Sequence, residues 1–146
     1  MIDNFRGEYA FLSNMYFSPI TIGGIKYTCA EAAFQAAKLQ DATLRIQFSG
    51  LSGHAAKKLG RSIPLRPDWE TIKIQVMRDV IHEKFAQNPM LREKLLATQG
   101  QKLVEGNEWN DIFWGKCNGI GKNWLGKILE DERSMCGQPL YSLSNI

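Results

Sequence analysis

The clearest alternation of hydrophobic and polar positions runs from Asp68 to Gln87. Hydrophobic residues recur there every three to five positions, and most charged residues fall between them, as in an amphipathic helix. An Asp at the start and Asn88-Pro89 after the end are typical helix boundary signals. The pattern predicts one long helix of about five turns. Its predicted buried side carries Trp69, Ile72, Val76, Val80 and Phe85.

Shorter helices are predicted on either side of this one. The first consists mostly of Ala, which favours a helix and lets neighbouring elements approach closely. Asp41 and Ser52 stand where helix N-caps are expected, and Gly60 stands where a helix is expected to stop. The predicted short helices cover residues 28–39, 42–48, 53–59, 90–96 and 122–133.

Strands are expected mainly near the N-terminus. Residues 16–22 and 25–28 alternate between hydrophobic and polar types around Gly23-Gly24, and a Gly pair supplies the positive φ angles of a tight hairpin turn. A further short strand is expected at residues 102–105. The predicted fold class is therefore mainly α (α+β), a compact helical domain with a small hairpin. It spans residues 1–146 as a single domain, with 137–146 as a C-terminal tail.

Composition narrows the setting without identifying a partner. A chain of 146 residues can bury a core without disulfides or a structural metal. The three cysteines lie far apart and form no CxxC pair, which indicates a reducing compartment, the cytoplasm. No segment resembles a membrane span or a signal peptide, so no membrane contact is expected. A net charge of +3 makes nucleic-acid binding by charge alone the least favoured function.

The predicted helix over residues 28–39 carries polar residues where a packed helix is normally apolar. Glu31, Gln35 and Lys38 are spaced by four and three residues, so they fall on one side of that helix. Glu31 and Lys38 either form a structural ion pair or face a pocket that lies between them. They are seven residues apart, whereas side chains in direct contact are three or four apart, and this favours the pocket.

The second unusual stretch is the loop over residues 106–121, which no periodic pattern explains. Large aromatic residues in a loop must be buried against either a ligand or the core. Trp114 is either a stacking wall for a ligand or a core residue on a turn. Trp109, and Trp124 in the last helix, are assigned to the core.

Carboxylates accompany this loop. Asp111 is either an acid/base or hydroxyl acceptor, or a cap that holds a turn. Glu105 ends an apolar run and faces either a cleft or solvent. His54 and His82 have no second His or Cys nearby, so they are interpreted as packed or solvated residues, and no metal site is predicted.

Several short blocks, in this order along the chain, resemble the YbiA-like, or NADAR, family. Each block is weak alone, but together they span residues 5 to about 133 and form a specific signal. The blocks are Phe11-Leu12-Ser13-Asn14; Thr28, Glu31, Phe34-Gln35 and Lys38; Gly60-Arg61, Leu65-Arg66 and Asp68-Trp69-Glu70; Lys84-Phe85; Leu103-Val104-Glu105; Asn110-Asp111 with Phe113-Trp114-Gly115; and Gly121-Lys122-Asn123-Trp124-Leu125-Gly126. One position departs, because the family commonly has a His where this chain has Ala32.

The resemblance implies a YbiA-like fold and N-glycosidase chemistry on ribose attached to a base or an amine. Two substrate types are implied: phosphoribosylaminopyrimidine intermediates of riboflavin synthesis, and ADP-ribose attached to guanine in a nucleoside or in nucleic acid. Both contain a C1–N bond, and no cofactor is implied. A non-catalytic module that binds ADP-ribose or NAD is the alternative.

For this chemistry, Lys38 suits a nucleophile that forms a Schiff base, because desolvation lowers the pKa of an amine. Glu31 is assigned as its acid/base partner, and Gln35 as a neutral positioning donor. The two unusual stretches are expected to face one cleft. The other catalytic candidates are Asp111 and Glu105, and the substrate-binding candidates are Ser13, Asn14, Phe34, Gln35, Arg61, Trp114, Gly115 and Asn123.

Overall fold

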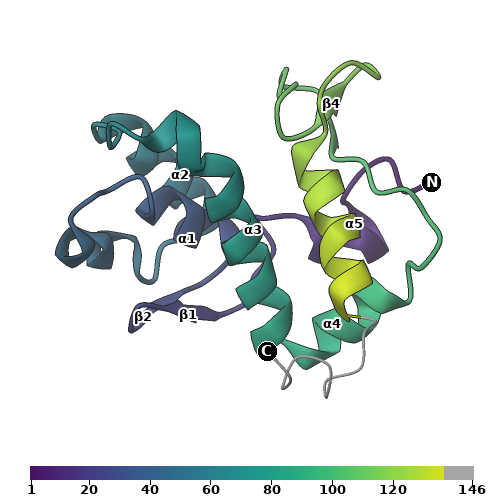
Figure 1. Cartoon of the computed structure of the whole chain (residues 1–146), viewed down its shortest axis with the longest axis horizontal. Coiled ribbons are helices and arrows are strands. Elements are labelled where there is room, and N and C mark those ends of the chain that lie inside the picture. Colours follow the sequence, from purple (N-terminus) through teal and green to yellow (C-terminus); the bar gives the residue numbers. More distant parts are fainter. Residues whose placement is uncertain (137–146) are drawn as a thin grey trace.

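A computed structural model describes residues 1–136, and the predicted tail over residues 137–146 lies outside them. The fold is mainly α with a small β component, as predicted (Figure 1). Within the described residues, no helix is long and apolar enough to cross a membrane. In chain order the elements are η1 (Gly7–Leu12, 3₁₀), β1 (Ile20–Ile22), β2 (Ile25–Tyr27), α1 (Ala30–Ala36), η2 (Ala42–Phe48, 3₁₀), α2 (Gly53–Ser62), α3 (Trp69–Gln87), α4 (Pro89–Leu96), β3 (Gly106–Asn107), β4 (Lys116–Cys117) and α5 (Trp124–Cys136).

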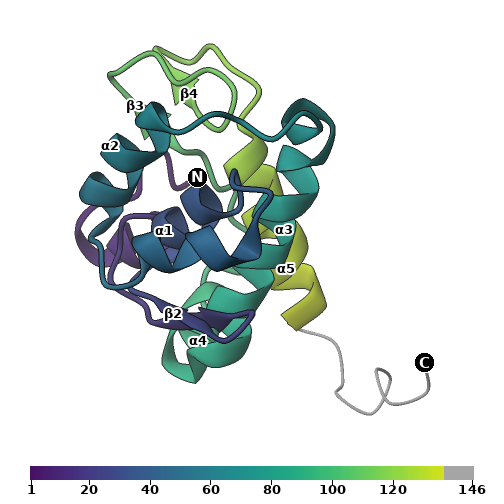
Figure 2. The ribbon, with the colours of Figure 1, turned by 90° about the vertical axis from the view of Figure 1, so that its left-hand side faces the viewer.

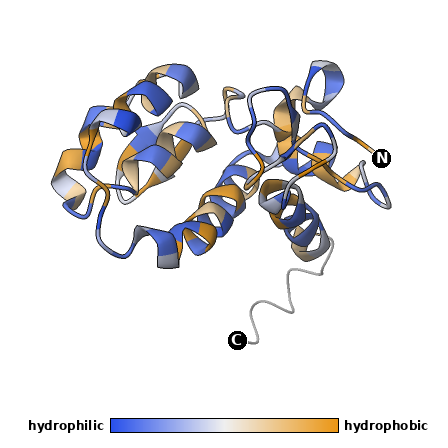
Figure 3. Cartoon of the chain, turned by 90° about the horizontal axis from the view of Figure 1, so that it is seen from above, coloured by the Kyte–Doolittle hydropathy of each residue, from blue (hydrophilic) through white to orange (hydrophobic). Residues whose placement is uncertain are grey.

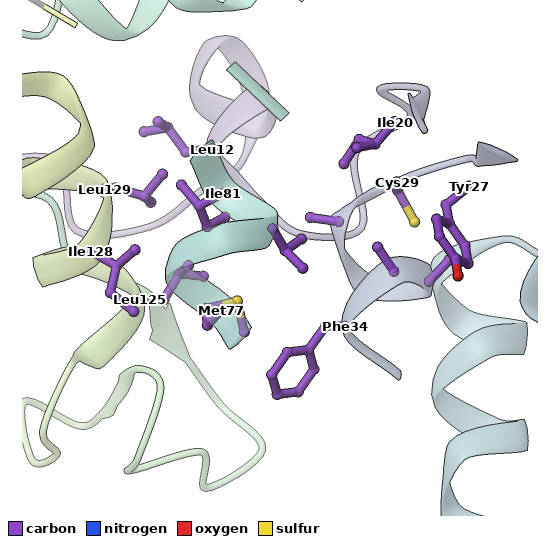
Figure 4. Close-up of a cluster of buried hydrophobic side chains, with 14 of the residues drawn as sticks. Leu12, Ile20, Tyr27, Cys29, Phe34, Met77, Ile81, Leu125, Ile128 and Leu129 are labelled. Carbon is purple, nitrogen blue, oxygen red and sulfur yellow. The ribbon is translucent and has the colours of Figure 1, made fainter. Parts of the chain in front are cut away.

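The long predicted helix is present as α3, and it occupies the centre of the molecule. It packs against α1 and β1 on one side and against α4 and α5 on the other (Figure 1 and Figure 2). Met77 and Ile81 of α3 lie between Leu125 and Leu129 of α5 and Phe34 of α1 (Figure 4). Hydrophobic and hydrophilic residues share the helices (Figure 3), so each helix contributes one side to this core.

The predicted buried side of α3 is largely confirmed, because Trp69, Val80 and Phe85 are buried. The periodicity missed Lys84, a charged residue with no exposed surface. Lys84 lies three positions after Ile81, so both fall on the inward side of the helix. The position of Lys84 on the hydrophobic side of the predicted helix could therefore have indicated that this lysine is buried.

The predicted hairpin is confirmed. Ile20 pairs with Tyr27 and Ile22 pairs with Ile25 in an antiparallel ladder, although each strand is only three residues long. The turn between them places Gly23 at φ +59° and Gly24 at φ +80°, values that glycine adopts without steric cost. Strand β1 of the hairpin packs against α3.

The predicted strand over residues 102–105 is wrong. Only Leu103 makes a bridge there, a parallel one with Ile2. The ladder forms just after this segment, where β3 and β4 pair in parallel. Both strands are two residues long, so neither has the hydrophobic alternation by which a strand is recognised from sequence.

The predicted N-caps at Asp41 and Ser52 are confirmed, whereas the Asp68 side chain before α3 makes no capping hydrogen bond. Asp41 Oδ1 accepts the Thr43 N–H at 2.9 Å, and Ser52 Oγ accepts the Ala55 N–H at 3.1 Å. The segment that follows Asp41 is a 3₁₀-helix. These side chains satisfy backbone donors that the first turn of a helix leaves without partners.

Gly60 is not the end of a helix, contrary to the prediction, because α2 continues to Ser62. Its role is to allow close packing. A Cβ at Gly60 would overlap Oε1 of Gln35 on α1. The glycine therefore lets α2 approach the polar side of α1, where Gln35 lies.

We expect a second close approach to be sensitive to substitution, at Gly126 in α5. A Cβ there would overlap the Leu103 carbonyl oxygen and the Asn123 side chain. Gly126→Ala should therefore lower the free energy of unfolding by about 1–3 kcal/mol, although Ala normally favours a helix. Urea unfolding measures this change. Ser134→Ala, on the exposed side of the same helix, is the control and should stay within about 0.5 kcal/mol of the wild type. Equal stability of Gly126→Ala and wild type contradicts the packing argument.

Candidate functional site

A cleft of about 550 Å³ lies between α1 and the loop that precedes α5. Its size is that of a small-molecule site. The two unusual stretches of the sequence both line it, as expected. The predicted site residues that line the cleft are Ser13, Asn14, Glu31, Phe34, Gln35, Lys38, Glu105, Asp111 and Trp114.

The side of α1 that faces the cleft carries Glu31 and Gln35. The Glu31 N–H donates to the Asn14 carbonyl oxygen at 2.9 Å, which ties the start of the helix to the neighbouring cleft wall. Gln35 Nε2 donates to Glu31 Oε2 at 2.7 Å. This hydrogen bond fixes the orientation of the Glu31 carboxyl group.

Lys38 is not on the helix, contrary to the prediction of a single helical stripe. The helix ends at Ala36, and Lys38 lies in the turn that follows, where its N–H donates to the Gln35 carbonyl oxygen at 3.2 Å. Its side chain nevertheless lines the same cleft as Glu31. No ion pair joins the two side chains, so the reading of a pocket between them fits better than a structural ion pair.

The surroundings bring both groups towards their neutral forms. Burial raises the pKa of the Glu31 carboxyl, and the Gln35 hydrogen bond and the Lys57 and Lys38 charges oppose this rise only in part. Burial lowers the pKa of the Lys38 amine; the Glu31 charge opposes this, and the Arg61 charge adds to it. Burial therefore moves the pKa of each group in the direction of its uncharged form, the free amine of Lys38 and the protonated carboxyl of Glu31.

Glu105 faces the cleft, which decides between the two environments left open by the sequence. Burial, and next the charge of Asp111, raise the pKa of Glu105 to about 7. A carboxyl of this kind can hold or release a proton near neutral pH.

Asp111 both closes a turn and lines the cleft. Its Oδ1 accepts the N–H groups of Phe113 at 3.2 Å and Trp114 at 3.0 Å. Asn107 fixes the other side of the loop, because its amide donates to the Asp111 carbonyl oxygen and accepts the Asp111 N–H, at 2.9 and 3.0 Å. Asp111 therefore caps the turn and lines the cleft at the same time, so the two interpretations do not exclude each other.

An aromatic cluster joins the two halves of the cleft. The Phe34 ring lies 5.1 Å from the Trp69 ring and 5.4 Å from the Trp114 ring, measured between centroids. The Trp114 contact is edge-to-face, at an interplanar angle of 85°. This geometry is favourable for aromatic pairs, and it fixes the loop against α1.

The assignment of Trp109 to the core is wrong. Its side chain is 57% exposed and lines the cleft. Trp109 lies within the loop that Asn107 and Asp111 close, so the turn carries its ring outward. Trp124 is half-buried, outside the cleft, with the Lys127 amine 5.0 Å from its ring centroid.

Three predicted binding residues lie outside the cleft lining: Arg61, Gly115 and Asn123. The Asn123 side chain accepts the Glu105 N–H at 3.0 Å and donates to the Leu103 carbonyl oxygen at 2.9 Å, so its role is to hold the backbone. Gly115 is required because a Cβ would overlap the Glu105 carbonyl oxygen. Arg61 is exposed and acts on the site through its charge near Lys38.

The sequence analysis did not place three cations in the cleft, Arg6, Lys57 and Lys73, and the imidazole of His54 lines it beside them. His54 and Lys57 are three residues apart on α2, a spacing that places both on one side of that helix. The sequence contains this spacing, but only the fold shows that this side faces the cleft. Within residues 1–136, no group of three or more His, Cys, Asp or Glu side chains is placed to hold a metal ion.

Comparison with known proteins gives consistent matches. The NADAR domain family model matches residues 3–135. N-glycosidase YbiA of Escherichia coli (strain K12) is 42% identical over 130 residues, which cover 86% of this chain and 81% of that protein. An N-glycosidase of Nostoc punctiforme is 36% identical over 147 residues, covering 94% of this chain and 92% of the relative.

Two further matches extend this comparison. A riboflavin biosynthesis protein of Vibrio vulnificus is 38% identical over 126 residues, covering 84% of this chain and 34% of that protein. The NMR structure of E. coli YbiA superimposes with a TM-score of 0.81 at 40% identity, covering 92% of this chain and 84% of the other.

The dual role of Asp111 is testable. Asp111→Asn keeps the oxygen that caps the turn but removes the charge that raises the pKa of Glu105. The pKa of Glu105, followed by the ¹³C shift of its carboxyl, should therefore fall below about 7. Unfolding free energy should stay within about 0.5 kcal/mol of the wild type. Asp111→Ala also removes the cap and should cost about 0.5–2 kcal/mol. An unchanged Glu105 titration in Asp111→Asn refutes the coupling.

Proposed function

The chain belongs to the NADAR family and is a hydrolase acting on N-glycosyl bonds, and from this premise we propose that it cleaves the C1–N bond of a ribosyl nucleotide. One observation carries the proposal. An amine and a carboxyl, those of Lys38 and Glu31, line the same cleft, and burial shifts both pKa values towards the neutral forms. Cleavage of this bond needs a nucleophile at C1 and an acid for the departing nitrogen.

Lys38 is the nucleophile in this mechanism. Its free amine attacks C1, and the bond from C1 to the base nitrogen breaks with both electrons leaving on the nitrogen. The new ammonium group loses one proton. The sugar ring then opens as the bond from C1 to the ring oxygen breaks and the second proton of Nζ passes to that oxygen, which leaves an imine between C1 and Nζ. Water then adds to this imine, which releases the sugar as an aldehyde and regenerates Lys38.

Glu31 is the acid. Burial raises the pKa of its carboxyl, which favours the protonated form that donates to the departing nitrogen. The Gln35 hydrogen bond holds Glu31 Oε2, so the proton is available on the other oxygen. Glu105, with a pKa of about 7, is placed to take a proton from the water that hydrolyses the imine.

The remaining cleft residues bind the substrate. Trp114 and Phe34 offer aromatic surface to the base, and stacking of a base on such a ring contributes about 1–3 kcal/mol. Asp111, Ser13 and Asn14 offer oxygen and amide groups to the ribose hydroxyls. The cations of the cleft, Arg6, Lys57 and Lys73, suit the phosphate groups of a nucleotide, to which the His54 imidazole can also donate a hydrogen bond.

Two substrate types fit this chemistry. A phosphoribosylaminopyrimidine is supported by the match to the Vibrio vulnificus riboflavin biosynthesis protein. ADP-ribosylated guanine presents the same C1–N bond with a larger group on the ribose. The family resemblance supports both substrates.

Lys38→Ala tests the nucleophile. Each substrate is incubated with enzyme, and chromatography measures the released base. Borohydride added during turnover should reduce the imine and trap a covalent adduct on the wild type but not on Lys38→Ala, whose rate should fall at least about 100-fold. Lys58→Ala, an exposed residue of α2, is the matched control and should keep the adduct and the rate.

Two outcomes separate the alternatives in this assay. Full activity of Lys38→Ala excludes the Schiff-base mechanism. Thermal stabilisation by both compounds with no base released indicates a binding module instead of an enzyme.

The pH dependence tests Glu31. The mechanism needs Lys38 without its proton and Glu31 with it, so the wild-type kcat should rise and then fall with increasing pH. Glu31→Gln cannot lose a proton, so its rate should rise with pH and level off without the fall. Its kcat should also be about 10²–10⁴-fold lower. A fall at high pH that persists in Glu31→Gln assigns the acid to another group. Glu105→Gln separates the two carboxyls of the cleft whose pKa is raised. It should slow hydrolysis of the imine but keep the fall of kcat at high pH, because Glu31 is still present.

A further inference from the structure

Lys84 takes no part in the chemistry above, although it is the only Lys of the described residues with no exposed surface. Its Nζ donates to the Ser13 carbonyl oxygen at 3.0 Å and lies 5.3 Å from the centroid of the Phe85 ring. Within residues 1–136, no carboxylate forms an ion pair with it. An ammonium group buried without a paired charge is costly to the fold, so its retention points to a role beyond packing.

The acceptor of this hydrogen bond belongs to the cleft wall. Ser13 and Asn14 both line the cleft, and the Asn14 carbonyl oxygen accepts the Glu31 N–H at 2.9 Å. The Asn14 amide also points at Met77 Sδ, 3.4 Å away. Segment 13–14 is thus held by α3 behind it and in turn holds the first turn of α1.

The charge of Lys84 also acts on the cleft. It lowers the pKa of Glu105, opposing the effect of burial. The other charged groups that act on Glu105 are Asp111, Glu31 and Arg6. Burial in turn lowers the pKa of Lys84 to about 7, and the Cys29 and Glu105 charges oppose this.

We infer that Lys84 is a positioning residue, which fixes segment 13–14 through the Ser13 carbonyl and thereby holds Glu31 at the cleft. The bonds run from Lys84 to Ser13, along the backbone to Asn14, and from Asn14 to the Glu31 N–H. The effect on catalysis rests on the proposed function, whereas the effect on the Glu31 backbone does not. A displacement of about 1 Å at a reacting group costs about 100-fold in rate.

Lys84→Met tests this inference, because Met fills a similar volume without donating a hydrogen bond. Amide hydrogen exchange, measured by NMR, should be at least about tenfold faster at Glu31 than in the wild type, relative to the Leu129 amide of the core. For a substrate that the wild type cleaves, the kcat of Lys84→Met should be about 10–100-fold lower, and its KM should change less than about threefold. Lys84→Gln keeps a donor without the charge and should show a smaller change in Glu31 exchange. It also serves as the second variant if Lys84→Met does not fold.

Arg133→Met is the matched control. Arg133 is a second buried cation, and its guanidinium donates to the Thr98 and Gln101 carbonyl oxygens at 2.9 and 2.8 Å, away from the cleft lining. Its loss should lower the thermal midpoint but leave Glu31 exchange, relative to the same reference amide, and the kcat of the folded fraction unchanged.

The outcomes are distinct. Wild-type Glu31 exchange in both Lys84 variants overturns the positioning role. The same is true if Arg133→Met accelerates Glu31 exchange as much as Lys84→Met does, because the effect is then one of general destabilisation. Faster exchange at Glu31 in a protein that cleaves neither substrate leaves the positioning role standing and removes the proposed function.

Discussion

The site depends on one aromatic contact, the edge-to-face packing of Phe34 against Trp114. Phe34 belongs to the helix that carries Glu31, and Trp114 belongs to the loop that carries Asp111. The two rings join these segments directly, with 5.4 Å between their centroids. Trp69 supports the same ring from α3, so the long central helix sets where both halves meet.

The elements with a strong local pattern were predictable from the sequence. The periodicity around Trp69 and Val80 predicts α3 because burial of one side of a helix requires that spacing, and Gly23-Gly24 predicts the hairpin because few other residues allow that turn. That Glu31 and Lys38 line one cleft was predictable for a similar reason, since polar residues among alanines indicate either an ion pair or a pocket, and their spacing favours the pocket. Each of these predictions rests on residues that are close to one another in the sequence.

The remaining features depend on neighbours distant in the chain. Gly60 does not end α2. A glycine is needed there because the Gln35 side chain, on another helix, leaves no room for a Cβ. Trp109 is exposed because hydrogen bonds across its loop, and not its own hydrophobicity, decide where the ring points. Lys84 is buried because a single backbone carbonyl lies within its reach. None of these partners is visible from the local sequence.

The burial of Lys38 has a consequence for the life of the protein before it folds. In a nascent chain its amine is in water and keeps its proton at neutral pH, as any exposed lysine does. The surroundings that lower the pKa of Lys38 are complete only when segments distant in the chain have docked. The lowered pKa of this amine is therefore a property of the folded protein, and the unfolded chain does not have it.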